Sequence, residues 1–205
     1  MKLKGFLLVL SGPSGVGKNT LMNAVFPNIP NLHYSISATT RPPRSGETHG
    51  VDYYFLSDQE FDEMIENDQF LEWAHFCGHR YGTPKFFVEE KIKQGKAVIM
   101  DVDIQGAIQI REKVNDAVLV FLLPPTWDEL KNRLTKRGKD PIESINQRLE
   151  RSFDELKYIN EYDYFIINDQ LDKAAERLTM IINAEWCRVE RADLSAFENL
   201  DKGVR

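Results

Sequence analysis

The sequence has few cysteines, no long apolar run and no excess of basic residues. Its two cysteines, Cys77 and Cys187, lie far apart, so we expect a reducing, cytoplasmic setting rather than a disulfide framework. No segment approaches the length needed to span a bilayer. The apolar stretch at residues 6–10 is also too short for a signal peptide. These absences exclude a disulfide-rich secreted class, and we expect no membrane partner.

Acidic residues outnumber basic ones: the chain has 32 aspartates and glutamates and 26 lysines and arginines, which gives a net charge of −6. No overall basic field is available to attract a nucleic-acid backbone, so we expect no nucleic-acid partner. Any anion site must therefore be built locally. Cys77 lies close to His75 and His79, but strand-like alternation accounts for this cluster better than a zinc site does.

A glycine-rich loop is the most informative feature that is present. Its pattern of Gly, four residues, Gly and Lys, between an apolar segment at 6–10 and a predicted helix at 20–26, is typical of a phosphate-binding loop. Glycines let successive backbone N–H groups turn toward phosphate oxygens, and the following helix adds the positive end of its dipole. A flexible surface turn would explain neither the flanking segments nor the spacing. The predicted nucleotide-phosphate site comprises Gly12, Pro13, Ser14, Gly15, Val16, Gly17, Lys18, Asn19 and Thr20.

A second candidate anion site follows at residues 37–54. Arg41 and Arg44 are three positions apart, stiffened by Pro42 and Pro43 and surrounded by hydroxyl groups. Guanidinium groups bind phosphate oxygens bidentately, and proline lowers the entropy cost of holding them in place. A solvated basic turn is the alternative, but the neighbouring phosphate loop favours a site for a small dianion such as a monophosphate.

Strands and helices alternate along most of the chain, which predicts an α/β fold with a parallel sheet covered on both faces. The segment between the two parts of this pattern is rich in predicted strands and indicates an insertion. Predicted strands lie at 6–10, 33–37, 51–56, 70–76, 80–81, 97–101, 117–123 and 164–167. Predicted helices lie at 20–26, 57–67, 83–95 and 126–136, then from the break at 138–141 to about 160, and at 171–192.

Three segments carry a resemblance to a known family. SATTRPPRSGETHGVDYYF, FLEWAHFCGHRYGT and MDVDIQG closely resemble the nucleoside-monophosphate site of guanylate kinases, and the resemblance extends over residues 5–190. It implies the three-layer P-loop NTPase fold with a parallel central sheet, a β-rich GMP-binding insertion and a helical lid. The implied divisions are a core (1–36, 84–125 and 158–192), a GMP-binding domain (37–83), a lid (126–157) and a C-terminal tail (193–205).

The resemblance also implies roles for the acceptor site. Glu72, Thr83 and Asp103 would recognise guanine, although Thr83 stands where the family usually has Ser. Guanine presents two neighbouring N–H donors to a carboxylate, whereas adenine would place a lone pair there. The implied GMP set comprises Ser37, Arg41, Arg44, Glu47, Tyr53, Glu72, Tyr81, Thr83, Asp101 and Asp103. Within it, Tyr53 and Tyr81 could instead be half-buried strand aromatics.

Arginines on two predicted helices complete the donor side. Solvated surface charge is the default for helical arginines, but Arg133, Arg137 and Arg148 match the family's lid positions over the ATP phosphates. Asn168 is similar to the family residue near adenine. Asp101 could orient Mg²⁺ through water or contact a substrate phosphate; strand-terminal Asp and Asn also serve in ordinary turns.

The implied reaction is transfer of the γ-phosphoryl group of ATP to GMP, and also to dGMP, giving ADP and GDP. Lys18, Arg41, Arg137 and Arg148 would be catalytic, and Mg²⁺ would accompany ATP. Asn19 stands where a hydroxyl normally meets the metal, so we expect altered metal affinity. ATP and GMP are the expected partners of a monomer or homodimer. The alternatives are a non-catalytic phosphoprotein-binding module and a kinase acting on another small phosphorylated metabolite, such as a ribose bisphosphate.

Overall fold

The computed structural model describes residues 3–136 and 142–192, with the side chains at 136 and 142–146 left out. The strands are β1 (Phe6–Ser11), β2 (Leu32–Tyr34), β3 (Ala38–Thr39), β4 (Tyr54–Phe55), β5 (Phe70–Phe76), β6 (His79–Pro84), β7 (Ala97–Asp101), β8 (Val118–Leu123) and β9 (Tyr164–Ile167). The α-helices are α1 (Lys18–Val25), α2 (Asp58–Glu66), α3 (Lys85–Lys93), α4 (Ile104–Lys113), α5 (Trp127–Lys136), α6 (Ile142–Leu156) and α7 (Leu171–Trp186). Short 3-10 helices are η1 (Phe26–Asn28), η2 (Ile159–Glu161) and η3 (Val189–Arg191).

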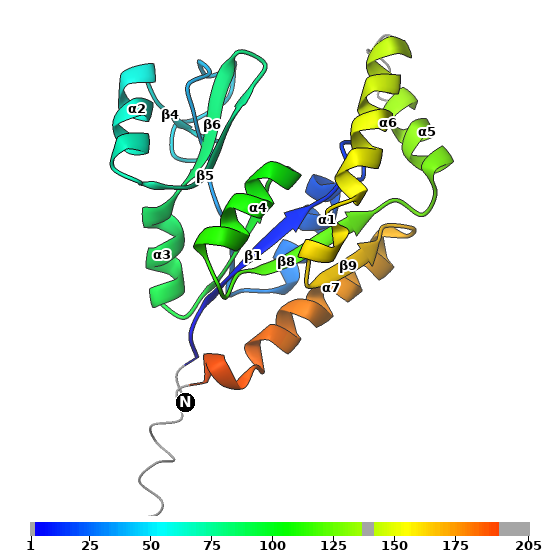
Figure 1. The fold of residues 1–205 in the computed structure, drawn as a ribbon. Helices are drawn as coiled ribbons and strands as arrows, with labels where there is room; N and C mark the ends of the chain where they lie inside the picture. The colour runs from blue at the N-terminus through cyan, green and yellow to red at the C-terminus, as the bar shows by residue number, and fades with distance from the viewer. Residues whose placement is uncertain (1–2, 137–141, 193–205) are drawn as a thin grey trace, which may run out of the picture.

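A five-stranded sheet forms the centre of the molecule, in the order β2-β7-β1-β8-β9 (Figure 1). Every pairing within it is parallel, which confirms the predicted α/β class. Because parallel strands end at the same edge, the segments after β1, β7, β8 and β9 meet there. Such carboxyl ends are where open α/β sheets bind ligands.

Helices cover both faces of this sheet and complete three layers. Along β1, Phe6, Leu8 and Leu10 pack with buried residues of α1 and α7, since side chains alternate between the faces of a strand. Leu7 and Val9 face the opposite way and pack with α3 and α4. In the residues that the structure describes, no helix is long and apolar enough to cross a membrane.

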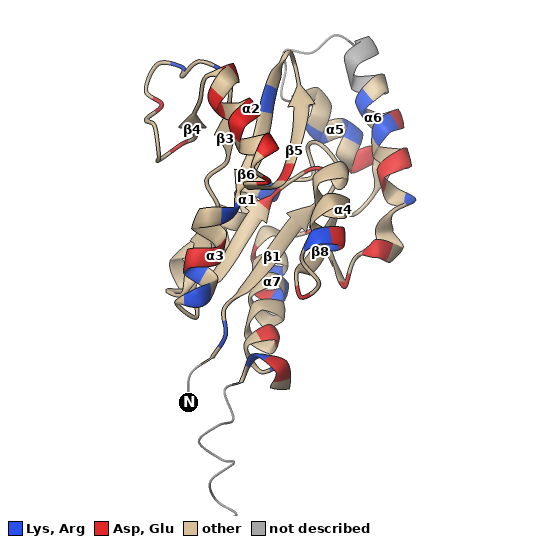
Figure 2. Cartoon of the chain, turned by 60° about the vertical axis from the view of Figure 1, so that its left-hand side comes forward, with Lys and Arg blue, Asp and Glu red and all other residues tan. Residues whose placement is uncertain are grey.

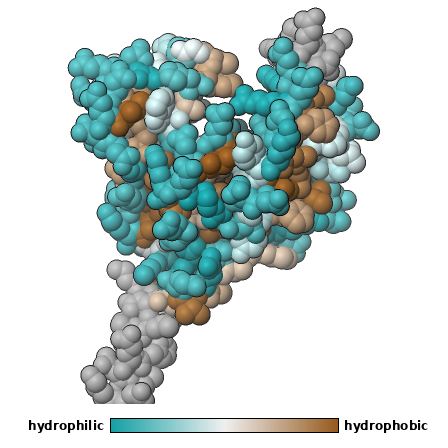
Figure 3. Space-filling model, viewed as in Figure 1, coloured by the Kyte–Doolittle hydropathy of each residue, from teal (hydrophilic) through white to brown (hydrophobic). Residues whose placement is uncertain are grey.

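A second sheet, in the order β4-β3-β6-β5, forms a separate lobe with α2. The predicted capping box at the start of α2 is present, since Ser57 and Glu60 exchange both of its hydrogen bonds. Phe61 of α2 stacks on Phe70 of β5 in the small core of this lobe. Figure 3 shows the surface hollowed between this lobe and the arm formed by α5 and α6.

The arm is held together by its own apolar contacts. Leu130 and Leu134 of α5 are buried with Leu149 of α6, and the rings of Trp127 and Phe153 stack at 4.1 Å. The predicted break at 138–141 lies outside the described residues. Both helices point away from the sheet beyond the carboxyl ends of its strands (Figure 1).

Several local predictions need correction. The strand predicted at 51–56 is limited to β4 (Tyr54–Phe55), and α6 ends at Leu156 rather than near 160. Helix α4 was not expected, because Gly106 in its first turn obscures a buried stripe of Ile104, Ala107 and Ile110. β2 begins earlier and ends sooner than 33–37, and β6 extends through Pro84, so α3 begins only at Lys85. α7 ends at Trp186 rather than at 192, and the short η3 follows it.

Candidate nucleotide-binding and phosphoryl-transfer site

The glycine-rich loop joins β1 to α1 in the arrangement expected from its sequence. Gly12, Gly15 and Gly17 all have positive φ angles, of 145°, 85° and 100°, which residues with a Cβ atom rarely adopt. Gly17 caps α1, and no side chain hydrogen-bonds to the helix start. The N-terminal N–H groups and the positive end of the helix dipole can therefore serve an anion.

Close packing also requires all three glycines, since a Cβ on Gly12 would clash with the carbonyl oxygen of Leu122 on β8. A Cβ on Gly15 would lie 2.7 Å from a methyl carbon of Leu134 on α5, and one on Gly17 would lie 2.7 Å from the amide nitrogen of Asn168. Asn168 follows β9, is buried, and donates from that nitrogen to the Val16 carbonyl at 2.8 Å. The loop is thus clamped between the arm and the end of the sheet.

Lys18 folds back over the loop that precedes it. Its ammonium group donates to the Gly12 carbonyl at 2.8 Å and lies 3.7 Å from a carboxylate oxygen of Asp101 at the end of β7. Desolvation raises the pKa of Asp101, and the charge of Lys18 opposes that rise. The two side chains place one positive and one negative charge beside the glycine-rich loop.

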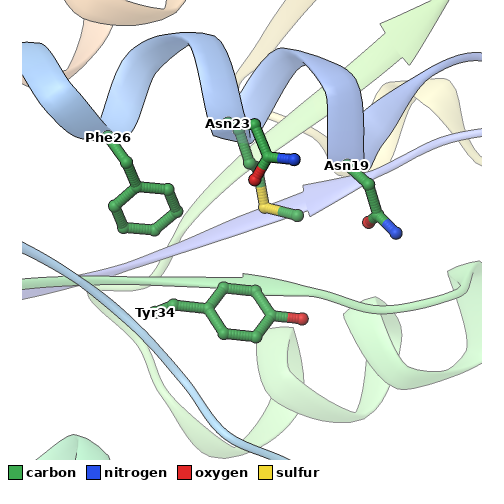
Figure 4. A pocket seen from close by; sticks show the side chains of 5 residues that line it. Asn19, Asn23, Phe26 and Tyr34 are labelled. Carbon is green, nitrogen blue, oxygen red and sulfur yellow. The ribbon is translucent and has the colours of Figure 1, made fainter. Parts of the chain in front are cut away.

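Asn19 lies in the first turn of α1. There it lines a pocket of about 400 Å³ together with Met22, Asn23, Phe26 and Tyr34. Figure 4 shows Asn19 and Asn23 on α1 and Phe26 directly after it, with Tyr34 across the pocket. Desolvation, followed by the charge of Asp101, raises the pKa of Tyr34 to about 12. Its hydroxyl therefore stays protonated at neutral pH, within the electrostatic reach of Asp101.

The arginine-rich turn is ordered by its own glutamate. Arg41 is buried and donates to a carboxylate oxygen of Glu47 at 2.9 Å, while the backbone N–H of Arg44 donates to the other oxygen at 2.7 Å. Although desolvation opposes it, hydrogen bonding to Glu47 and Tyr81 raises the pKa of Arg41. The Tyr53 ring centroid lies 5.5 Å from this guanidinium and 6.0 Å from the Tyr81 ring. Ser37 lies just before β3, where its carbonyl accepts from the Tyr54 N–H.

The three predicted guanine contacts lie beside one another. Glu72 on β5 is buried, and it accepts the Thr83 hydroxyl from β6 at 2.7 Å. Asp103 caps α4 by accepting the Gly106 N–H at 2.9 Å. A Cβ on Gly106 would lie 3.1 Å from the second Glu72 oxygen, so α4 passes close to this carboxylate. Burial raises the pKa of Glu72 to about 7, against the Thr83 hydrogen bond and with a contribution from Asp103.

The arm contributes several charged side chains. Arg133 of α5 donates to the carbonyls of Val16 and Asn168 at 3.3 and 3.0 Å and pairs with Glu129. Arg148 lies half-exposed on α6, and Arg137 lies outside the described residues. Basic and acidic residues both occur along α6 (Figure 2).

Most predicted residues that the structure describes gather around the carboxyl end of the sheet and the facing lobe. Ser14 and Thr20 are exposed, at the loop and on α1 respectively. Sequence reasoning missed Tyr34, Glu155 and the pairing of Arg151 with Asp103. The only signal was the helical spacing that places Arg151 and Glu155 one turn apart.

The fold and the glycine-rich loop define a P-loop nucleotide-binding protein with a separate β-rich lobe. The family model described as guanylate kinase matches residues 4–185. The guanylate kinase of Desulfitobacterium hafniense (strain Y51) is 50% identical over 187 residues, covering 91% of this chain and 94% of the relative. That of Caldanaerobacter subterraneus subsp. tengcongensis is 48% identical over 191 residues, or 93% of each chain.

A solved structure extends the comparison to three dimensions. The crystal structure of guanylate kinase from Anaplasma phagocytophilum matches with a TM-score of 0.76 at 30% identity, covering 100% of this chain and 98% of that chain. This chain belongs to the guanylate kinase family.

Proposed function

We propose that this protein is a guanylate kinase that transfers the γ-phosphoryl group of ATP to GMP, giving ADP and GDP. Family membership supports the activity, and the buried pair of Glu72 and Thr83 is the observation that carries the substrate assignment. A buried carboxylate beside a hydroxyl suits the paired N–H donors of guanine. Leaving such a group unpaired costs about 1–3 kcal/mol, and more when it is charged, so adenine should be rejected strongly.

The donor side is the glycine-rich loop with Lys18. The loop N–H groups and the α1 dipole would hold the ATP phosphates, and Lys18 would exchange its Gly12 carbonyl for a phosphate oxygen. Arg133 already contacts the carbonyls of Val16 and Asn168. Arg133 would therefore hold the loop in place near Asn168 and also place a positive charge near the ATP phosphates. Residues 126–157 would act as the lid.

The acceptor side is the lobe at residues 37–83. Arg41 and Arg44 would bind the GMP phosphate together with the hydroxyls of Ser37, Tyr53 and Tyr81. Glu47 holds both arginines in place, one through its guanidinium and one through its backbone. We assign Glu47 this supporting role. Because the acceptor is already an anionic phosphate, catalysis comes from alignment and charge neutralisation rather than from a strong base. Arg137 and Arg148 would supply further positive charge as the lid closes.

Mg²⁺ would be held with ATP by few protein ligands. Asn19 at the start of α1 and Asp101 at the end of β7 both carry side-chain oxygens, and Mg²⁺ prefers oxygen ligands while keeping several waters. No group of three or more His, Cys, Asp or Glu side chains able to hold a metal ion occurs in the described part of the chain. This donor set fits a metal bound mainly by phosphates. When bound, the ion would neutralise phosphate charge.

Neither alternative accounts for this arrangement. A phosphoprotein-binding module has no need for an intact phosphate loop with Lys18. An acceptor without a base has no use for Glu72 and Thr83. The cytoplasmic setting expected from the low cysteine content is part of the proposal.

A coupled assay of ADP formation tests the proposal. Purified protein with ATP and Mg²⁺ is given GMP, dGMP, AMP, UMP or CMP as acceptor. We expect turnover with GMP and dGMP well above the other three. Equal stimulation by all five nucleotides, or none by GMP, would overturn the assignment.

A further inference from the structure

We propose that Arg151 of α6 is a positioning residue for the guanine site, holding the carboxylate of Asp103 from across the cleft. This inference rests on the proposed function. A guanidinium nitrogen of Arg151 lies 3.5 Å from the Oδ2 atom of Asp103. The other oxygen of the same carboxylate, Oδ1, accepts the Gly106 N–H. Each oxygen of Asp103 therefore has its own partner, one from α4 and one from the arm.

The Arg151 side chain is itself held between two carboxylates. Its Nε atom lies 3.6 Å from Glu155, one turn further along α6, while its terminal nitrogen faces Asp103. Glu155 is far less exposed than Arg151, with 14% of its side chain accessible against 57%. A largely buried Glu155 thus anchors one side of the guanidinium and directs the other side toward the core.

This arrangement offsets a repulsion built into the guanine site. Glu72 and Asp103 both face the same region, and the charge of Asp103 acts on Glu72. Two carboxylates recognising one base repel each other, and a nearby cation reduces that cost. Arg151 places its charge on the side of Asp103 away from the Gly106 contact. It therefore holds the Asp103 carboxylate in a fixed orientation, ready to accept an N–H group of guanine.

The contact also links the two halves of the reaction. Arg151 belongs to the arm that would close over ATP, whereas Asp103 belongs to the acceptor site. The ion pair is present with α6 in the position described here, and a displacement of α6 would change its length. Coupling between two sites is reciprocal. If GMP binding strengthens the Arg151–Asp103 ion pair, it therefore also favours this position of the arm.

The test compares the Michaelis constants for GMP and ATP in four proteins: wild type, Arg151→Ala, Arg151→Lys and Asp103→Asn. We expect Arg151→Ala to raise the KM for GMP by about two- to fivefold, the size typical of a solvent-accessible ion pair. The KM for ATP should change much less. Arg151→Lys should restore part of the GMP affinity, because it keeps the charge but loses the fork geometry.

The double variant Arg151→Ala/Asp103→Asn separates positioning from general support of the arm. If Arg151 acts through Asp103, its removal has no further effect on the KM for GMP once Asp103 is changed. Lys93→Ala is the matched control, because it removes an exposed ion pair to Glu89 on α3, outside the proposed lid and binding sites. It should leave both constants unchanged.

Three results would overturn the inference. The first is an unchanged KM for GMP in Arg151→Ala, and the second is an equal rise in the KM values for GMP and ATP. The third is that Arg151→Ala raises the KM for GMP as much in the Asp103→Asn protein as in the wild type. The failure of wild-type protein to form ADP in response to GMP would instead refute the proposed function.

Discussion

The Thr83 hydroxyl donates a hydrogen bond to the buried carboxylate of Glu72 at 2.7 Å, across two neighbouring antiparallel strands. This hydrogen bond lowers the pKa of Glu72, but desolvation of the buried carboxylate outweighs it. The pKa of Glu72 therefore rises to about 7. The carboxylate assigned to guanine thus titrates close to neutral pH. We therefore expect its protonation state to affect both the use of GMP and the free energy of unfolding.

The first prediction concerns the pH dependence of GMP use. Only ionised Glu72 can accept both N–H groups of guanine, so kcat/KM for GMP should fall as the pH drops below about 7. The measurement is kcat/KM for GMP between pH 5.5 and 9 at saturating ATP. Glu72→Gln is the control, and its residual activity should lack this inflection. A wild-type profile identical to that of Glu72→Gln would contradict the assignment.

The second prediction concerns the cost of this carboxylate to folding. The folded-state pKa of about 7 exceeds the ordinary 4.5, so the folded protein binds more protons between these values. The free energy of unfolding therefore decreases as the pH rises from about 4.5 to 7. Glu72→Gln removes this penalty while keeping an oxygen for Thr83. It should raise the free energy of unfolding at pH 8 by up to roughly 3 kcal/mol, since one pKa unit is worth about 1.4 kcal/mol.

Urea unfolding at pH 5 and pH 8 checks this prediction. The gain should be much smaller at pH 5, while GMP binding by Glu72→Gln should be weak at both pH values. Equal stability of the two proteins at pH 8 would argue against a strained carboxylate.

The third prediction concerns Asn19. An amide oxygen there can contact Mg²⁺, but with a longer reach than a serine hydroxyl. We expect Asn19→Ser to change the Mg²⁺ concentration for half-maximal activity severalfold, with the KM for GMP unaffected. Mg²⁺ titration at fixed ATP measures this. Asn23→Ser, at a position further along the same pocket, is the matched control. An unchanged metal dependence in Asn19→Ser would show that position 19 is not a ligand.

The fourth prediction concerns a buried ion pair far from the proposed chemistry. Arg191 and Glu185 are both almost fully buried and lie 2.8 Å apart; Tyr164 donates to the other Glu185 oxygen. Arg191 also lies over the Phe6 ring and connects the segment after α7 to β1. Arg191→Met leaves buried Glu185 with only the half-exposed Arg188, 3.6 Å away, as a cationic partner, which should cost up to about 3–5 kcal/mol.

Urea unfolding of Arg191→Met and of Arg191→Met/Glu185→Met separates the causes. The double variant should recover much of the lost free energy of unfolding, because it also removes the buried negative charge of Glu185. A double variant less stable than the single one would indicate that packing, rather than charge, dominates here.

Much of the fold could be predicted because its signals are local. The phosphate loop combines a short apolar strand, spaced glycines and a helix start within one segment. The capping box at Ser57 is equally local. Helix α4 was missed because Gly106 argues against a helix, and its close approach to Glu72 and Val102 explains that glycine. β2 and the end of α7 were misplaced because tertiary pairing, rather than propensity, sets their limits.

The candidate site was predictable where residues of one type recur at short spacing, as Arg41 and Arg44 do. Contacts between distant segments leave no such pattern. The pairing of Arg151 with Asp103 joins α6 to the start of α4, and Tyr34 faces Asn19 across a pocket formed by α1 and β2. Glu47 was expected to contact GMP, whereas its two observed bonds hold the arginines.

Transfer of a labelled phosphoryl group tests the central claim most directly. ATP carrying ³²P at the γ position is incubated with the protein, Mg²⁺ and GMP, and the nucleotides are separated. The account predicts that the label appears in GDP, in step with the formation of ADP, and that AMP in place of GMP yields almost no labelled product. Label released mainly as inorganic phosphate, or transferred equally well to AMP, would contradict it.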